Sequence, residues 1–225
     1  MALPSIQNTA DIRIGAIKVL TYGPTNAGKT FLCSTAPNPL VLSVESGLLS
    51  LSSKNLPYME IQNYAQMMEI HARLLSSQEA RKAFQTICLD SLTEIMEVLL
   101  THEKSINKDG RQAYGALLDN GMALVRMFRN LPFNVYMSAQ MEYVKDDVQG
   151  GVKYGPSMPG SKLSQKLPYQ FDEVFKADVG VDKSGNRYHY LLTQSDLQNT
   201  AKDRSGKLAP IEYPDLTAIF TKIAS

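Results

Sequence analysis

The stretch Gly23-Pro24-Thr25-Asn26-Ala27-Gly28-Lys29-Thr30 decides how the rest of this chain is interpreted. It matches in full the pattern G-x-x-x-x-G-K-[S/T], a glycine-rich loop that joins a strand to a helix and surrounds a phosphate group. Residues 15–22 before it are apolar and β-branched, as a buried strand is, and residues 31–34 after it can open a helix. This context favours a nucleotide-binding loop over a glycine-rich turn that happens to precede a lysine.

The motif predicts a chemical role for its main residues. Gly23 and Gly28 let backbone N–H groups approach the phosphates, and the helix N-terminus adds partial positive charge. Lys29 supplies a point charge for the β- and γ-phosphates, which also makes it a catalytic candidate, and the Thr30 hydroxyl can ligate Mg²⁺. We therefore expect ATP and Mg²⁺ as cofactors. The predicted nucleotide contacts are Gly23, Pro24, Thr25, Asn26, Ala27, Gly28, Lys29, Thr30 and Phe31.

Composition sets few limits on function. The chain has 225 residues, of which 44% are hydrophobic, so it can form a packed core, and we expect a single domain over residues 1–225. No apolar run reaches the length of a membrane span and no signal peptide is evident, so we expect a cytoplasmic protein without a membrane partner. The cysteines, Cys33 and Cys88, are expected to be buried thiols. A net charge of +1 means that a local patch must hold any nucleic-acid partner.

Strand-like runs alternate with helix-like runs along the chain. This order is typical of an α/β fold with a mostly parallel central sheet flanked by helices. A C-terminal β-hairpin is expected, with strands at 171–179 and 188–193 around a turn at 183–186. The other expected strands are 15–22, 39–44, 84–89 and 134–139; the expected helices begin at Asn63 and Ser91, cover about 116–130, and follow Pro214.

Residues 141–169 show no sustained periodicity. They are rich in Gly, Pro, Ser, Lys and Asp, and a stretch of this length inside a compact domain is typical of a functional loop. We expect it to be a mobile loop.

Asp90 has the form of a metal-binding acid. It follows the apolar run 84–89, which presents one carboxylate at the tip of a strand. Such a carboxylate holds Mg²⁺ next to the hydroxyl of the phosphate loop, here Thr30. The alternative is a helix cap, because Asp-Ser begins many helices.

Two further polar residues end apolar strands. Glu45 follows the second expected strand and could orient and deprotonate the water that attacks the γ-phosphate. Glu94 is the rival base, although its spacing from Ser91 fits a helix-capping box. Gln140 ends the strand 134–139 and could sense the γ-phosphate, since a neutral amide can bond to the phosphate or to the attacking water.

The segment 201–206 places Lys202 and Arg204 two residues apart. If this segment is a strand, both side chains face the same side. Such a pair could act as cationic fingers that stabilise transition-state charge at the ATP of a neighbouring subunit. Most Lys-x-Arg pairs are solvated surface residues, so the spacing alone is a weak signal.

These features together resemble the RecA/KaiC/replicative-helicase branch of P-loop ATPases, and most of all phage RecA-like nucleotide-binding and single-strand-annealing recombination proteins. The resemblance covers nearly the whole chain. It rests on the phosphate loop, Glu45, the sequence 89–91, the strand tip 138–140, residues 159–174 and the Lys-x-Arg segment 201–206. We expect neither an N-terminal polymerisation domain nor a large C-terminal domain, which departs from the recombinase pattern.

The resemblance implies partners as well as a fold. It implies a RecA-like core and a homo-oligomer, a ring or filament, with ATP between subunits and Lys202 and Arg204 acting in trans. It further implies that the segments 105–114 and 141–169 face single-stranded DNA, in phage recombination or replication in the host cytoplasm, with a single-stranded-DNA-binding protein as a further partner. Tyr143, Tyr154 and Tyr169 could stack on bases. The expected DNA-binding residues are Lys145, Lys153, Tyr154, Lys162 and Lys166.

Two other classes of protein share the phosphate loop. A P-loop kinase could act on a small molecule, although thymidine-kinase-like proteins with this motif have zinc-binding cysteine pairs, and this chain has only two cysteines. An ATP-switched scaffold could bind a protein partner without binding DNA. Phosphate release and nucleoside phosphorylation, each measured with and without single-stranded DNA, would separate the three classes.

Overall fold

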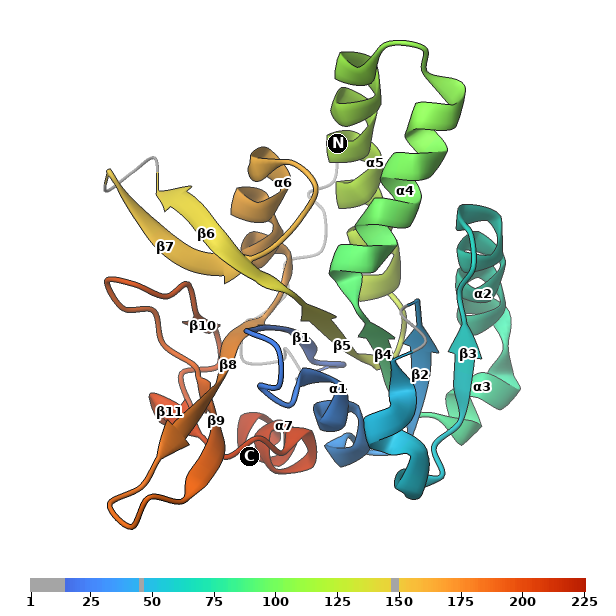
Figure 1. Ribbon diagram of the computed structural model, residues 1–225. Coiled ribbons are helices and arrows are strands. Elements are labelled where there is room, and N and C mark those ends of the chain that lie inside the picture. Colours follow the sequence, from blue (N-terminus) through green and yellow to red (C-terminus); the bar gives the residue numbers. More distant parts are fainter. Residues whose placement is uncertain (1–14, 45–46, 147–149) are drawn as a thin grey trace, which may run out of the picture.

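A nine-stranded sheet forms the centre of the part of the chain that the computed structural model describes, residues 15–44, 47–146 and 150–225 (Figure 1). Its order is β11-β9-β8-β1-β5-β4-β2-β3, and β10 pairs with β8 outside this path. The bounds are β1 (Lys18–Tyr22), β2 (Pro39–Ser43), β3 (Tyr58–Glu60), β4 (Thr86–Asp90), β5 (Asn134–Ala139), β8 (Glu173–Val181), β9 (Arg187–Leu192), β10 (Lys202–Asp203) and β11 (Ile211–Glu212).

The strands from β8 to β3 run parallel to their neighbours, whereas β9, β10 and β11 add to one side of the sheet in antiparallel pairs. Every residue of β2 and β4 is buried, as expected of parallel strands covered on both faces. The β8–β9 hairpin turns at residues 182–186. The predicted α/β fold with a mostly parallel sheet and a C-terminal hairpin is therefore confirmed.

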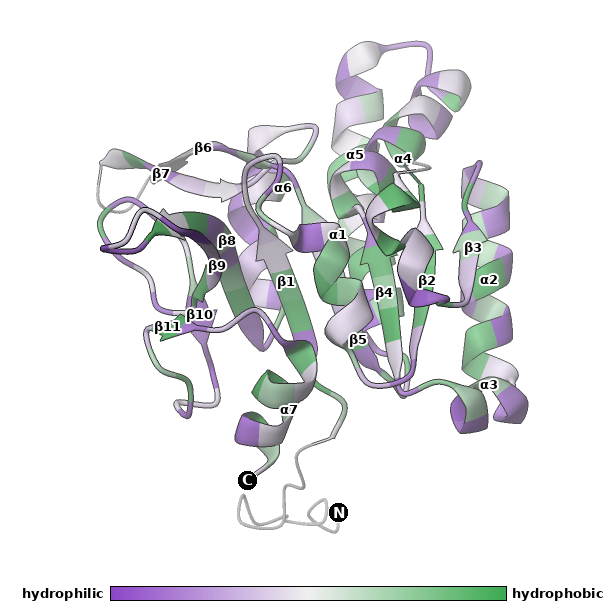
Figure 2. Ribbon diagram, turned by 60° about the horizontal axis from the view of Figure 1, so that its bottom comes forward, coloured by the Kyte–Doolittle hydropathy of each residue, from purple (hydrophilic) through white to green (hydrophobic). Residues whose placement is uncertain are grey.

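Helices cover both faces of the sheet. Leu20, Ile87 and Met137 belong to the core on one face, whereas Val19, Cys88 and Tyr136 belong to the core on the other, so neighbouring residues of a strand point to opposite layers. Figure 2 shows how hydrophobic β1 and β4 are. The first layer contains α2 (Tyr64–Ser76), α4 (Leu92–Ile106), α5 (Gly110–Arg129) and α6 (Ser161–Lys166); the second contains α1 (Lys29–Leu32), α7 (Leu216–Ala224) and the 3₁₀ helices η2 (Cys33–Thr35) and η3 (Leu48–Lys54).

Side chains cap the helices as the sequence predicts. Asn63 accepts a hydrogen bond from the amide of Gln66 at 2.9 Å, and Ser91 accepts one from the amide of Glu94 at 3.5 Å. A short helix that was not expected, α3 (Gln78–Ala83), begins at Ser77. The helix after the phosphate loop is shorter than a regular α-helix, because α1 ends at Leu32 and continues as η2.

The segment 105–114 is not the loop that the resemblance implied. Its first residues end α4, residues 107–109 connect the helices, and α5 already begins at Gly110. The physical reason is that Asp109 caps the helix, while Asn107 and Asn120 both donate hydrogen bonds to the buried Glu103 carboxylate, which joins the end of α4 to α5. The tip of this helical hairpin projects beyond the sheet (Figure 1).

The expectation of a loop over 141–169 is wrong for the described residues of this segment. This segment forms the hairpin of β6 (Met141–Asp146) and β7 (Gly151–Pro156), followed by α6 and the 3₁₀ helix η4 (Leu167–Gln170). Its polar residues satisfy one another: the Glu142 carboxylate accepts hydrogen bonds from the hydroxyls of Ser157 and Ser164 at 3.2 and 2.5 Å. These bonds tie the hairpin to α6, so the polar residues of this segment belong to regular structure.

Candidate functional site

An open cavity of about 980 Å³ lies where β1, β4 and β5 end. This is the edge at which ligands bind in open α/β sheets, and the volume suits a nucleotide. Every predicted nucleotide contact from Gly23 to Phe31 lines the cavity. The other lining residues are Gly47, Leu49, Ser50, Asp90, Ser91, Gln140 and Met141.

Two glycines of the loop are required by geometry. Gly28 has a φ of +85°, in the left-handed region that a residue with a side chain rarely adopts. A Cβ atom on Gly23 would lie 2.3 Å from the carbonyl oxygen of Ala177 on β8, which is too close for any side chain. The loop therefore keeps its shape only with glycine at both positions.

The side chain of Lys29 folds back over the phosphate loop. Its ammonium donates hydrogen bonds of 2.8 Å to the carbonyls of Gly23 and Pro24. This position places a positive charge over the loop where the motif predicts the phosphates.

Asp90 and Thr30 meet in the cavity, although 60 residues separate them. The Thr30 hydroxyl donates a 2.8 Å hydrogen bond to Asp90 Oδ2, and the Ser138 hydroxyl donates to Asp90 Oδ1. Leu89 pairs with Met137, so the next residues of the two strands, Asp90 and Ser138, lie side by side. The peptide bond between Asp90 and Ser91 is cis. The two predicted metal ligands are therefore in direct contact.

The donor atoms of this pair fit magnesium. Mg²⁺ prefers oxygen ligands and usually binds to one or two protein groups, several waters and the phosphates of its nucleotide. Thr30 and Asp90 offer hydroxyl and carboxylate oxygens of this kind. The described residues contain no cluster of three or more His, Cys, Asp or Glu that could hold a metal ion.

Gln140 lies in the cavity wall, beside the start of α4. Its side-chain amide donates a 3.2 Å hydrogen bond to Glu94 Oε1, and its backbone amide donates one of 2.9 Å to the Thr93 hydroxyl. The two residues considered as γ-phosphate sensor and rival base are thus in contact. Glu45, the preferred base, lies outside the described residues.

Lys202 lies level with the middle of the sheet, and Arg204 lies toward the edge opposite the phosphate loop. Lys202 pairs with Val174 on β8, which lies beside the middle of β1, and Arg204 continues toward the edge where β1 begins. Lys202 Nζ donates a 3.1 Å hydrogen bond to the carbonyl of Pro168, and Arg204 forms a 2.7 Å ion pair with Asp172. Both cations therefore reach the segment 168–172, far from the ATP site of their own chain.

A comparison with models of protein families matches residues 16–205 to the AAA domain. The match extends over more than half of the chain and contains the phosphate loop, Asp90, Gln140 and the Lys-x-Arg segment. The chain belongs to the AAA domain family. Its phosphate-binding loop is accordingly that of a nucleotide-binding ATPase domain. A comparison with curated proteins found no match.

The expected DNA-binding residues of this AAA domain lie on three neighbouring elements, β6, β7 and α6. Lys153 and Tyr154 are on β7, and Lys162 and Lys166 are exposed, one turn apart on α6, which contacts both strands of the hairpin. Lys145 belongs to β6, but its side chain lies outside the described part of the chain.

Of the three tyrosines that the sequence offers for stacking on bases, Tyr143 and Tyr169 are exposed, whereas Tyr154 is partly covered. The Tyr154 ring has the Tyr143 ring at 4.4 Å between centroids and the Lys176 ammonium at 5.2 Å, so its faces have partners within the protein. Tyr143, by contrast, is 67% exposed and presents the outer face of the pair. The pairing register of β6 and β7, which places Tyr143 opposite Tyr154, determines this difference.

No helix in the described ranges is both long enough and apolar enough to cross a lipid bilayer.

Tyr136 and Ser138 contact the site, but the sequence suggested no role in it for either residue, although Ser138 belongs to the strand tip 138–140 on which the resemblance rests. The alternation along β5 was the available signal, because it places both of them on the face that carries α1.

Proposed function

We propose that this AAA domain is a Mg²⁺-dependent ATPase of the RecA-like kind that acts on single-stranded DNA as a homo-oligomer. The observation that carries the ATPase part of the proposal is the hydrogen bond between Thr30 and Asp90 in a cavity lined by the whole phosphate loop. It brings the two expected metal ligands within 2.8 Å of each other, next to the position of the β- and γ-phosphates.

Hydrolysis needs a group that activates water and a group that responds to the γ-phosphate. We propose Glu45 as the base and Gln140 as the sensor, because Gln140 lies in the cavity wall and already bonds to a carboxylate, Glu94. In this proposal the Gln140 amide bonds to the γ-phosphate while ATP is intact, and it returns to Glu94 when that phosphate is lost. Mg²⁺, when bound, would neutralise charge on the phosphates, with Thr30 and Asp90 as its protein ligands.

The β6–β7 hairpin is the surface that we propose for DNA. It follows Gln140 directly in the chain and projects from the sheet (Figure 1). Tyr143 offers an exposed ring on which a base can stack, and the exposed Lys162 and Lys166 can contact phosphates beside it. Stacking with few cationic contacts suits single-stranded DNA without sequence preference.

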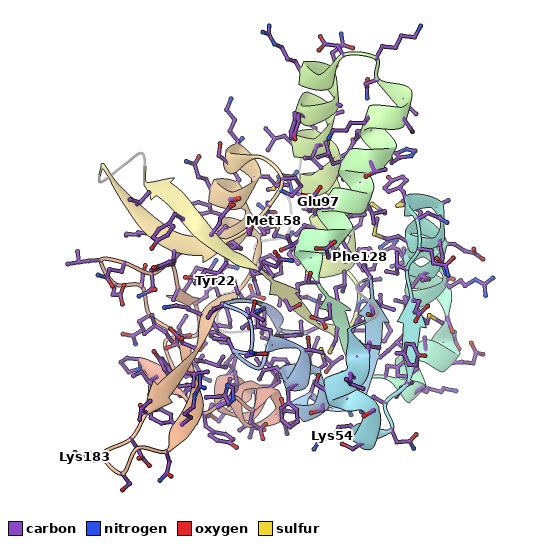
Figure 3. The ribbon with its side chains drawn as sticks, in the orientation of Figure 1. Tyr22, Lys54, Glu97, Phe128, Met158 and Lys183 are labelled. Atoms are coloured by element: carbon purple, nitrogen blue, oxygen red, sulfur yellow. The ribbon has the colours of Figure 1, made fainter. Side chains whose placement is uncertain are left out.

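A direct contact links this hairpin to the ATP site. The buried Tyr22, labelled in Figure 3, precedes Gly23 of the phosphate loop, and its hydroxyl donates a 2.9 Å hydrogen bond to the carbonyl of Tyr154. The same hydroxyl accepts a hydrogen bond from the amide of Thr200, in the segment that leads to Lys202. We infer that DNA bound to the hairpin stimulates hydrolysis through this junction.

The position of Arg204 supports assembly. At the far edge of the sheet it can act on ATP only if that ATP belongs to another subunit. Mixing Arg204→Ala protein with Lys29→Ala protein tests this. Some interfaces in the mixture would place the Arg204 of one variant beside the unaltered phosphate loop of the other, so part of the activity should return. Activity equal to the sum of the two variants, although mixed oligomers form, would refute the trans role.

Phosphate release with and without a long oligonucleotide, measured beside nucleoside phosphorylation, tests the whole proposal. We expect Mg²⁺-dependent phosphate release that the oligonucleotide increases. Transfer of phosphate to a nucleoside would favour the small-molecule kinase. ATP binding without DNA binding or DNA stimulation would favour the ATP-switched scaffold.

A further inference from the structure

A row of buried polar side chains crosses the sheet beneath the phosphate loop. Thr21 on β1 pairs with Ser138 on β5, Ser138 lies beside Asp90 on β4, and Asp90 pairs with Ser43 on β2. All four are at most 7% exposed, and they lie on the face of the sheet that carries α1. Buried polar groups in a sheet are costly unless they are bonded, and in this row Ser138 and Asp90 are bonded to each other.

Ser138 holds one side of the metal-binding carboxylate. Its hydroxyl donates to Asp90 Oδ1, while Thr30 of the phosphate loop donates to Oδ2. Ser43, on the other side of Asp90, is 1% exposed, and its hydroxyl has no hydrogen-bond partner among the described residues. Of the two serines that flank Asp90, Ser138 is therefore the one that fixes the carboxylate.

Tyr136 holds the phosphate loop from the same strand, two residues before Ser138. Its hydroxyl donates a 2.8 Å hydrogen bond to the carbonyl of Lys29. In a regular α-helix the amide of Cys33 would bond to this carbonyl, but here that amide donates to the carbonyls of Phe31 and Thr30 as α1 tightens into η2. The Tyr136 hydroxyl thus takes the place of the missing helix hydrogen bond to the carbonyl of Lys29, the proposed catalytic lysine.

We propose that Tyr136 and Ser138 are positioning residues of the ATP site, with Tyr136 orienting the first turn after the phosphate loop and Ser138 orienting Asp90 toward Mg²⁺. This rests on the proposed Mg²⁺-ATP function. One strand, β5, then sets both halves of the site relative to each other, because its residues two apart point to the same face. Neither residue is among those that line the cavity, so both would act through the groups they bond to, Lys29 and Asp90.

The test measures equilibrium binding of a fluorescent, non-hydrolysable ATP analogue, first in EDTA and then against rising Mg²⁺. Ser138→Ala should raise the half-saturating Mg²⁺ concentration about 10-fold, the scale for loss of an outer partner of a metal ligand, and leave binding in EDTA within about twofold. Tyr136→Phe should weaken binding about threefold to tenfold equally with and without Mg²⁺, as expected for one lost hydrogen bond. A merely structural role would not divide the two effects in this way.

Ser43→Ala is the matched control, because it removes the same hydroxyl from the other side of Asp90. It should leave both measurements within about twofold, since an unbonded buried hydroxyl contributes little. Equal effects of Ser43→Ala and Ser138→Ala, or no effect of Ser138→Ala in folded protein, would overturn the role of Ser138. Unchanged binding in Tyr136→Phe would overturn that of Tyr136.

If Ser138→Ala does not fold, Ser138→Cys carries the test, because it fills similar space with a weaker donor and should give an intermediate Mg²⁺ requirement. A requirement like that of the wild type would again overturn the role of Ser138. Wild-type protein that binds no analogue at any Mg²⁺ concentration would instead refute the proposed function, so the two failures are distinguishable.

Discussion

The Tyr22 hydroxyl donates a hydrogen bond to the Tyr154 carbonyl, which joins the strand that ends in the phosphate loop to the base of the β6–β7 hairpin. Burial raises the pKa of Tyr22, so the hydroxyl remains a donor at physiological pH. The backbone of Tyr154 also bonds to Gln198 and Thr200, at 2.6 and 2.9 Å. Tyr22 therefore contacts the two segments that the proposed mechanism must couple to ATP.

Tyr22→Phe should separate DNA binding from its effect on hydrolysis. The substitution removes one hydroxyl and keeps the ring, so affinity for ATP and for DNA should each change less than about threefold. DNA stimulation should fall at least about fivefold, the lower range of coupling between sites. Phosphate release titrated with oligonucleotide measures this. Full stimulation in the variant would exclude Tyr22 from the coupling.

Asp90, Glu45 and Glu94 should differ in what they contribute. Asp90→Asn should weaken Mg²⁺-dependent ATP binding, whereas Glu45→Gln should bind Mg²⁺-ATP normally yet turn over at least ~100-fold more slowly, the scale for a lost general base. Glu94→Gln should keep most of the activity, because Glu94 bonds to Gln140. Single-turnover hydrolysis measures all three. Normal turnover in Glu45→Gln with a silent Glu94→Gln would transfer the base to Glu94.

DNA affinity should depend on Tyr143 more than on other exposed tyrosines. Tyr143→Ala should cost about 1–3 kcal/mol of binding, the range for one stacked base. Tyr213, which is 77% exposed near the C-terminus, provides the control, and Tyr213→Ala should have no effect. Replacing Lys162 and Lys166 together should reduce the slope of log K against log salt by about 1.4, since each phosphate contact contributes about 0.7. Fluorescence anisotropy with a labelled oligonucleotide measures both.

In the DNA experiment, equal losses in Tyr143→Ala and Tyr213→Ala would contradict stacking on the hairpin. An unchanged salt slope in the lysine variant would remove α6 from the DNA surface.

Stability should fall as pH rises because of Glu173. Burial, and then the nearby Asp203, raise the pKa of this carboxyl from 4.5 to about 8, while the unfolded chain releases the proton near 4.5. Between these values the folded state holds one more proton, so stability is highest at low pH and declines as pH rises toward about 8. The lowered pKa of Lys18, about 8, acts only above this window.

Glu173→Gln mimics the protonated acid and should lose this pH dependence. Its free energy of unfolding relative to the wild type should increase by about 2 kcal/mol between pH 5.5 and pH 7.5. Urea denaturation at the two pH values measures the difference. A constant difference would show that Glu173 is ionised in the folded protein.

Some features of the fold were predictable because they depend on residues that are close in sequence. These are the phosphate loop, the helix caps at Asn63 and Ser91, and the alternation along the strands. The β6–β7 hairpin was missed because Glu142 satisfies the hydroxyls of Ser157 and Ser164, contacts that only the folded chain brings together. The start of α5 was missed because glycines disfavour helices in isolation.

The same difference between contacts close in sequence and contacts made only in the folded chain applies to the candidate site. Thr30 and Asp90 were predictable because each ends a recognisable motif, and parallel strands bring their ends to one edge. Ser138 was not, because a serine in an apolar strand has no meaning until the register places it beside Asp90. The outward-facing tyrosine of the hairpin also depended on register, which the sequence pattern did not define.

Calorimetric titration of the protein with ATP in the presence of Mg²⁺ tests the central claim most directly. The wild type should bind ATP, and Lys29→Ala should lose at least ~100-fold in affinity while remaining folded by circular dichroism, because a charge-assisted contact to the phosphates disappears. Equal affinity in the two proteins, or no binding by the wild type, would contradict the assignment of the Gly23–Thr30 loop as the nucleotide site.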